Sequence, residues 1–248
     1  MEHSQTLGFA HFLAQTDTVG KVILAILVAM SVATWYLILT KGLENLARRR
    51  RSGRFLATFW NAPSFAAVER HLEEQHPNEP FSHLAYHAIA SSRHHARHGV
   101  NRLTEAGSAA EFLTRSIRRV IDEETARLES GLTVLASVGS TAPFVGLFGT
   151  VWGVYHALVN IGLAGQGTLD KVSGPVGEAL VMTALGLAVA IPAVLAYNAL
   201  VRSNRLVLAK LDAFAHDVFS FLTTGAHYGE ADAALPRTAM PKVVKGAA

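Results

Sequence analysis

The chain has 248 residues and a formal net charge of +3; 50% of its residues are hydrophobic, which is unusual for a soluble protein. It contains no cysteine, and this excludes disulfides, thiolate catalysis and cysteine-based zinc sites. The apolar residues concentrate in three stretches, each near or above the ~20 residues that a spanning helix needs: residues 22–40, 132–163 and 175–201. The pattern predicts an all-α membrane protein with three transmembrane helices, two of which extend into a helical cytoplasmic domain.

The first apolar stretch follows a short N-terminal segment, residues 1–21. A secretory signal has a basic start, whereas here the basic cluster comes after the apolar run. The cluster comprises Lys41, Arg48, Arg49, Arg50, Arg51 and Arg54. By the positive-inside rule it stays in the cytoplasm, so we expect the N-terminus in the periplasm. This explains the arginines through membrane orientation rather than through binding of RNA or lipid.

Residues 41–131 are charged and helical in pattern, and we expect a cytoplasmic helical domain with a break near residues 61–64. Two histidine pairs with i, i+4 spacing lie here, a spacing that can present two imidazoles to one metal: His83 with His87, and His94 with His98. No cysteine or well-spaced acid completes such a site. A solvated face is therefore the favoured interpretation, with no metal and no cofactor.

Ser108 and Glu111 have the spacing of a capping box. From there apolar residues keep helical spacing into the second span. A continuous helix from this cap to about Asn160 would be ~80 Å long. The positions at which it can bend are Gly131, Gly139 and Pro143.

The second span has one face of small or polar side chains. Steps of four and three residues give Gly139, Pro143, Gly146, Thr150, Gly153, Ala157, Asn160 and Ala164. The opposite stripe carries Phe144, Phe148, Val151 and Tyr155. Such a helix packs closely against other helices, and its thin side can also border a polar pore. Helix packing alone is the alternative, because this spacing is common in membranes.

Residues 164–174 are rich in glycine and are predicted to form a periplasmic loop, with Pro175 in the first turn of the third span. The third span has its own small stripe: Ala179, Thr183, Gly186, Ala190, Ala193 and Tyr197. Residues 202–225 continue an amphipathic pattern on the cytoplasmic side, and we expect this helix to pair with the one that precedes the second span. Residues 226–248 are predicted to be disordered.

Glu178 is the only acid in the third span. An ionisable group inside a membrane is a functional candidate, because burying its charge is costly. Its position near the helix start gives an equally good structural explanation, since the helix dipole favours an acid there. Thr150 and Thr183 can line a polar path or hold water, or their hydroxyls can bond to their own helix backbone.

Two blocks of sequence carry a family resemblance. Residues 141–153 read TAPFVGLFGTVWG, and residues 177–187 read GEALVMTALGL. They resemble the signature of the ExbB/TolQ/MotA proton-channel family, and their order and separation match the ExbB and TolQ branch, with ExbB nearer. One departure precedes the acid, where the chain has Gly174-Pro175-Val176-Gly177 in place of a Pro-Gly-Ile-Ala type run.

The resemblance implies a homo-oligomeric ring in the bacterial inner membrane, a pentamer, around the single transmembrane helices of an ExbD-like or TolR-like dimer. Protons enter through an aspartate of that partner, and the relative movement of ring and partner energises TonB or TolA. The family's polar path residues fall on Thr150, Glu178 and Thr183. The implied role is coupling of the proton-motive force to TonB-dependent outer-membrane transport; a TolQ-like role in envelope integrity is the alternative.

Two other classes of function are weighed against this one. A scaffold that conducts nothing would work normally with Glu178→Gln. An integral-membrane enzyme would use Glu178 with His156, but no nucleophile or three-ligand set supports it. We therefore expect no catalytic residue, no enzymatic activity and no nucleic-acid partner.

Overall fold

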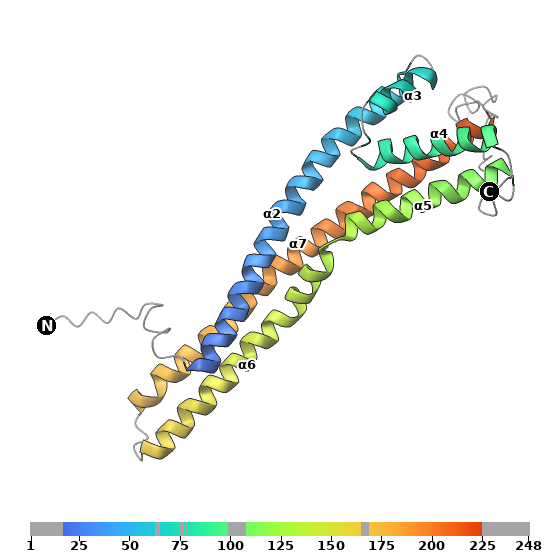
Figure 1. Cartoon of the computed structure of the whole chain (residues 1–248). Coiled ribbons are helices and arrows are strands. Elements are labelled where there is room, and N and C mark those ends of the chain that lie inside the picture. The colour runs from blue at the N-terminus through green and yellow to red at the C-terminus, as the bar shows by residue number, and fades with distance from the viewer. Residues whose placement is uncertain are drawn as a thin grey trace, which may run out of the picture. The chain divides into compact units, whose positions relative to one another are not determined.

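The computed structural model describes residues 17–62, 65–74, 77, 79–98, 108–164 and 169–224. For residues 65, 66, 96, 98, 160, 164, 169–175 and 178 it describes the backbone alone. The elements are α2 (Thr18–Trp60), α3 (Phe65–Glu74), α4 (Pro80–His98), α5 (Ala109–Glu129), α6 (Leu132–Ala164) and α7 (Leu169–Thr224) (Figure 1). Over these residues the chain is all-α, as predicted. Residues 1–16 of the expected periplasmic N-terminus, residues 165–168 of the expected loop and the expected tail lie outside the described residues.

The chain divides into two units. The membrane unit comprises residues 1–48 and 128–205, and the second unit comprises residues 49–127 and 206–248. Three helical stretches among the described residues are long and apolar enough to cross a membrane: Thr18–Trp60, Ala109–Leu163, whose apolar part is α6, and Ala179–Thr224. The prediction of three transmembrane helices is confirmed.

In the membrane unit, α2, α6 and α7 share one apolar core. Each helix contributes fully buried side chains, among them Leu27 on α2, Leu135 on α6 and Ala193 on α7. Large side chains such as Val32 and Tyr36 point outward instead. Because lipid is as apolar as these side chains, association of the three helices depends on close packing rather than on the hydrophobic effect.

The helix that leads into the second span is not continuous. α5 ends at Glu129 and α6 begins at Leu132, and between them Gly131 adopts a φ of 82°. That left-handed conformation is open to glycine at little steric cost. The helix from the capping box to the second span is therefore not continuous, and Gly131, one of the three positions at which a bend was expected, interrupts it.

Other helix bounds also differ from the expected ones. α2 runs through the arginine cluster to Trp60 without a break, because arginine is a good helix former and no proline occurs before Pro63. α7 begins at Leu169, ahead of Pro175. α6 continues through Pro143, as membrane helices tolerate proline when neighbouring groups satisfy the freed carbonyl.

The second unit has its own core, built around Phe214 of α7. Its ring makes edge contacts with Phe55, Phe59, Trp60 and Phe81, with centroids 5.0–6.3 Å apart. Residues from α5 and from the end of α7 belong to this same core, among them Ile117 and Val218. The expected pairing of these two helices is confirmed.

Polar side chains fix the helix starts in the second unit. Ser108 Oγ accepts from Glu111 N at 3.3 Å, and Glu111 Oε2 accepts from Ser108 N at 3.1 Å, which confirms the capping box. Buried Glu79 caps α4 by accepting from Ser82 N at 2.5 Å, and it also accepts from Ser52 Oγ of α2 at 2.6 Å.

Candidate functional site

Helices α6 and α7 come closest where Gly146 faces Gly186. A Cβ added to Gly146 would lie 2.6 Å from the Met182 carbonyl oxygen and 3.1 Å from the Gly186 Cα. A Cβ added to Gly186 would lie 2.7 Å from the Ala142 carbonyl oxygen. Any side chain here would press on backbone atoms, so glycine permits this close approach.

The other predicted small residues lie along the same contact with different neighbours. A Cβ on Gly153 would lie 3.0 Å from the Ala179 Cβ, while one on Gly139 would lie 2.5 Å from Val194 Cγ2. Ala190 is buried in the membrane-unit core. Pro143 is half-buried within α6.

Gly149 is a member of this contact that the sequence interpretation missed. A Cβ there would lie 3.1 Å from Met182 Cγ and 3.2 Å from Ile23 Cγ2, so Gly149 meets both α7 and α2. It lies three residues after Gly146 and four before Gly153. That spacing is also helical, and a search for a second small stripe would have found it.

Thr150 and Thr183 meet across the α6–α7 contact. Their hydroxyl oxygens are hydrogen-bonded to each other, and Thr150 Oγ1 also lies 3.2 Å from the carbonyl oxygens of both Gly146 and Ala179. Each hydroxyl carries one proton and two lone pairs. The pair is half-buried and forms a short polar bridge inside an otherwise apolar contact.

Glu178 lies on the α7 backbone directly before Ala179, whose carbonyl faces Thr150. Its side chain lies outside the described part of the chain, as do those of Asn160 and Ala164. The structure thus brings Thr150 and Thr183 together and places the Glu178 backbone beside them.

The bulky stripe of α6 faces outward from the single chain. Phe144 is 70% exposed, and Phe148, Val151 and Tyr155 are between 55% and 60% exposed. The face of α6 that carries small or polar side chains therefore packs within the chain. The bulky face is left for lipid or for another subunit.

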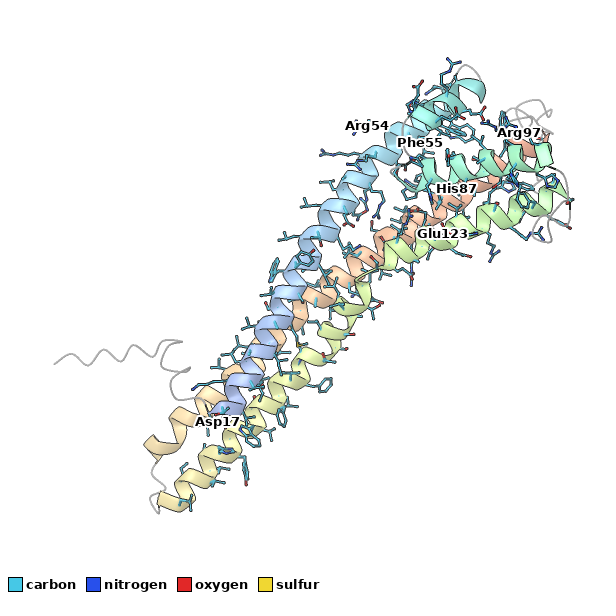
Figure 2. The ribbon with its side chains drawn as sticks, in the orientation of Figure 1. Asp17, Arg54, Phe55, His87, Arg97 and Glu123 are labelled. Atoms are coloured by element: carbon cyan, nitrogen blue, oxygen red, sulfur yellow. The ribbon has the colours of Figure 1, made fainter. Side chains whose placement is uncertain are left out.

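A second polar group joins α2 to α6 at the start of α2 (Figure 2). Asp17 Oδ2 accepts from Trp152 Nε1 at 2.7 Å, and Asp17 Oδ1 accepts from Gly20 N at 2.8 Å. Burial acts to raise the pKa of Asp17, but these bonds, with the charges of His156 and Lys21, hold it below its ordinary value. The His156 ring lies 4.6 Å from the Trp152 ring, so the residue considered for an enzyme packs against an aromatic side chain.

The histidine stretch lies on α4, in the second unit. His83 Nδ1 is 2.9 Å from Glu124 Oε1 of α5, and the His83 and His87 rings are 4.6 Å apart. Partial burial lowers the pKa of His87, and the neighbouring His83 lowers it further. In the part of the chain that the structure describes, no group of three or more His, Cys, Asp or Glu side chains is placed to hold a metal ion. The side chain of His98, from the second predicted pair, lies outside the described residues.

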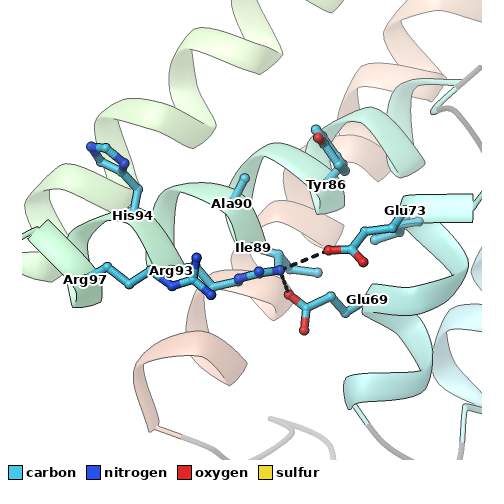
Figure 3. Close-up of a pocket in the computed structure, with 9 residues that line it drawn as sticks. Glu69, Glu73, Tyr86, Ile89, Ala90, Arg93, His94 and Arg97 are labelled. Carbon is cyan, nitrogen blue, oxygen red and sulfur yellow. Dashed lines mark hydrogen bonds and ion pairs between the residues drawn. The ribbon is translucent and has the colours of Figure 1, made fainter.

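A charged hollow in the second unit lies between α3 and α4 and has a volume of about 300 Å³ (Figure 3). Arg93 reaches across it to Glu69 and Glu73, the latter at 3.1 Å. Hydrogen bonds from these two carboxylates raise the pKa of Arg93. Arg93 therefore links α4 to α3 through these ion pairs.

Comparison with known proteins shows the family of the chain. The profile of the MotA/TolQ/ExbB proton channel family matches residues 80–213. A protein of Xanthomonas campestris pv. campestris, "Biopolymer transport protein ExbB", is 43% identical over 228 residues, which cover 89% of this chain and 90% of the relative. A Neisseria meningitidis protein of that name is 41% identical, covering 79% and 88%. "Tol-Pal system protein TolQ" of Pseudomonas aeruginosa is 30% identical, covering 87% and 92%. By its sequence, its three membrane helices and the match across both signature blocks, the chain belongs to the MotA/TolQ/ExbB proton channel family.

Proposed function

We propose that the chain is the channel subunit of a proton-driven motor, with Thr150, Glu178 and Thr183 along the proton path. The observation that carries this proposal is the hydroxyl pair of Thr150 and Thr183 inside the apolar α6–α7 contact. Hydroxyls can pass a hydrogen bond or hold water, but they do not carry a charge at neutral pH. Glu178 supplies the group that can be protonated and deprotonated. Placing a charged side chain in a membrane costs free energy, and a role in the proton path explains why an acid occupies this position.

The proposed assembly is a homo-oligomeric ring, a pentamer, in the bacterial inner membrane. Residues 1–21 and 164–174 lie in the periplasm, and residues 41–131 and 202–248 lie in the cytoplasm. Basic residues flanking the spans support this orientation. The exposed bulky stripe of α6 supports contact with a neighbouring subunit, because each member of a ring needs a face that packs against the next member. An ExbD-like single-span subunit occupies the ring and carries the aspartate through which protons enter.

Within the family, an ExbB-like role is preferred: coupling of the proton-motive force, through TonB, to transport across the outer membrane. It is supported by relatives named ExbB at 41–43% identity, against 30% for the TolQ relative. A TolQ-like role with TolR and TolA is the second candidate. The two differ in the partner that is moved rather than in the proton path.

Complementation distinguishes the two roles. The chain is expressed with an ExbD-like single-span partner in a strain that lacks ExbB and ExbD, and with a TolR-like partner in a strain that lacks TolQ and TolR. We expect restored uptake of a TonB-dependent substrate in the first strain and persistent detergent sensitivity in the second. The opposite pattern would assign the TolQ-like role.

Glu178→Gln, expressed to the same level in the membrane, is the matched variant for this experiment. It keeps the size and hydrogen-bonding capacity of the side chain but cannot carry a proton. We expect it to restore nothing in either strain. If it restores transport as well as the unchanged chain does, the scaffold that conducts nothing becomes the better account.

A further inference from the structure

The chain passes between its two units three times, at residues 48/49, 127/128 and 205/206. On the membrane unit's side, residues close to each crossing point bond to residues close to another crossing point. The bonded pairs are Asn45 with Ser203, Asn204 with the Leu128 carbonyl, and Lys41 with Ser130. We call these groups the crossing clamp.

The central bond of the crossing clamp connects α7 to the end of α5. Asn204 is 6% exposed, and its Nδ2 donates to the Leu128 carbonyl oxygen at 2.7 Å. The last carbonyls of a helix have no partner within that helix. A buried polar group without a partner costs about 1–3 kcal/mol, so the amide and the carbonyl satisfy each other where α5 ends.

The two other bonds of the crossing clamp connect α2 to α7 and to Ser130, which lies between α5 and α6. Ser203, which is 5% exposed, lies 2.7 Å from Asn45 Nδ2 and 3.0 Å from Asn45 Oδ1. Lys41 Nζ donates to Ser130 Oγ at 3.0 Å. A Cβ on Gly131 would lie 3.2 Å from Leu37 Cδ2, so α2 also packs directly against the helix break.

We propose that the crossing clamp makes the three passages move as one body. Gly131 is the natural hinge between α5 and α6, since the helix ladder is interrupted there and glycine has few backbone restrictions. The bonds from α2 and α7 to residues 128 and 130 close this hinge. A displacement of the membrane helices is then delivered to the second unit, instead of being absorbed at Gly131. Asn204 is a positioning residue in this device and takes no part in the proton path.

Distance measurements by electron paramagnetic resonance test the clamp. The chain has no cysteine, so spin labels can be attached at Thr114→Cys and Thr133→Cys, two exposed positions on either side of Gly131. Labelled chains are diluted with unlabelled chains in the membrane so that only distances within one chain are read. We expect a broader distance distribution in Asn204→Leu than in the parent.

Asn61→Leu is the matched control. Its Nδ2 also donates to a backbone carbonyl at 2.7 Å, but the acceptor is Ala57 in the last turn of α2, which ends just before Asn61, and the site is exposed. We expect it to leave the distribution unchanged. Ser203→Ala, which removes a single oxygen and with it the bonds to Asn45, is the second variant and is expected to broaden the distribution as well. Parent-like widths in both clamp variants would overturn the proposal.

A functional measurement separates transmission of movement from stability. In membranes that contain the partner subunits, we expect Asn204→Leu to keep its proton flux per inserted chain while partner-driven transport falls at least about fivefold, the lower end of measured coupling effects. If proton flux and partner-driven transport fall in proportion, Asn204 only stabilises the fold. Retention of both would mean that the clamp transmits nothing. Either result overturns the proposal.

Discussion

The hydroxyl of Thr150 on α6 is bonded to the hydroxyl of Thr183 on α7, beside two glycines that let the helix backbones meet. Thr150 also bonds to the Gly146 carbonyl of its own helix at 3.2 Å. The own-helix bond and the bond between helices therefore coexist. The close glycine contact brings the two hydroxyls within bonding distance, and the proposed proton path assigns this polar pair a chemical role.

Replacing Thr150 with valine tests that role. Valine keeps the shape of threonine but removes the hydroxyl, and Thr183 then loses its partner on α6. We expect proton flux to fall by about two- to tenfold, because a net hydrogen bond is worth about 0.5–1.5 kcal/mol. The measurement is flux into liposomes per assembled complex.

Thr150→Ser is the control for this substitution, since it keeps the hydroxyl and loses only a methyl group. We expect its flux to stay close to that of the parent. If valine and serine variants conduct equally, the hydroxyl is not needed and Thr150 serves packing alone.

Replacing Gly146 with alanine tests the helix contact itself. The added Cβ would lie 2.6 Å from the Met182 carbonyl, a backbone atom that cannot rotate away. Overpacking of this kind costs about 1–3 kcal/mol, so we expect a lower thermal unfolding midpoint in detergent.

Gly42→Ala is the comparison for Gly146→Ala. Gly42 is also helical, but a Cβ there meets nothing within 4 Å. Alanine should raise stability at that position, because glycine in a helix costs roughly 0.5–1 kcal/mol relative to alanine. Similar effects of the two substitutions would contradict the close α6–α7 approach.

The second unit is expected to lose stability in acid through His87. Partial burial and the facing His83 lower its pKa, outweighing the attraction of Glu123, and Arg119 and Arg127 oppose the imidazolium further. A lowered histidine pKa means that the unfolded chain binds the proton more readily. Stability is therefore complete above the ordinary value of 6.5 and falls as the pH drops from 6.5 toward the lowered pKa.

His87→Gln removes this titration. The unfolding midpoint, followed by circular dichroism between about pH 7.5 and pH 5, should fall less in the variant than in the parent. Glu123 titrates in the same direction, chiefly because its bond to Arg119 lowers its pKa, and that bond is present in both proteins. A parallel fall in the two proteins would show that His87 does not set the acid response.

The sequence predicted those features that local patterns encode. The three apolar spans, the Ser108 capping box and the small face of α6 each follow from residues within one helix. Individual side-chain bonds between distant residues could not be predicted, because no pattern within one helix indicates them. Asp17 bonds to Trp152, 135 residues away, and Asn204 bonds to Leu128, 76 residues away.

The helix break at Gly131 could be predicted only in part. Glycine marked it as a point of weakness, but glycines also occur inside α6 at Gly139 and Gly146, where the helix continues. What differs is the surroundings: Gly131 is half-buried against α2, whereas Gly139 and Gly146 pack against α7. Tertiary packing therefore decides which glycine ends a helix and which one admits a neighbour.

The most direct test of the proton-path account is proton flux into liposomes under an imposed membrane potential. The samples are the chain alone, the chain with its co-purified partner, and the Glu178→Gln chain with the partner. We expect flux only when the partner is present, and a sharp fall in the Glu178→Gln sample. If Glu178→Gln with the partner conducts as well as the parent, Glu178 is a helix-end acid and the proposed path through Thr150, Glu178 and Thr183 is wrong.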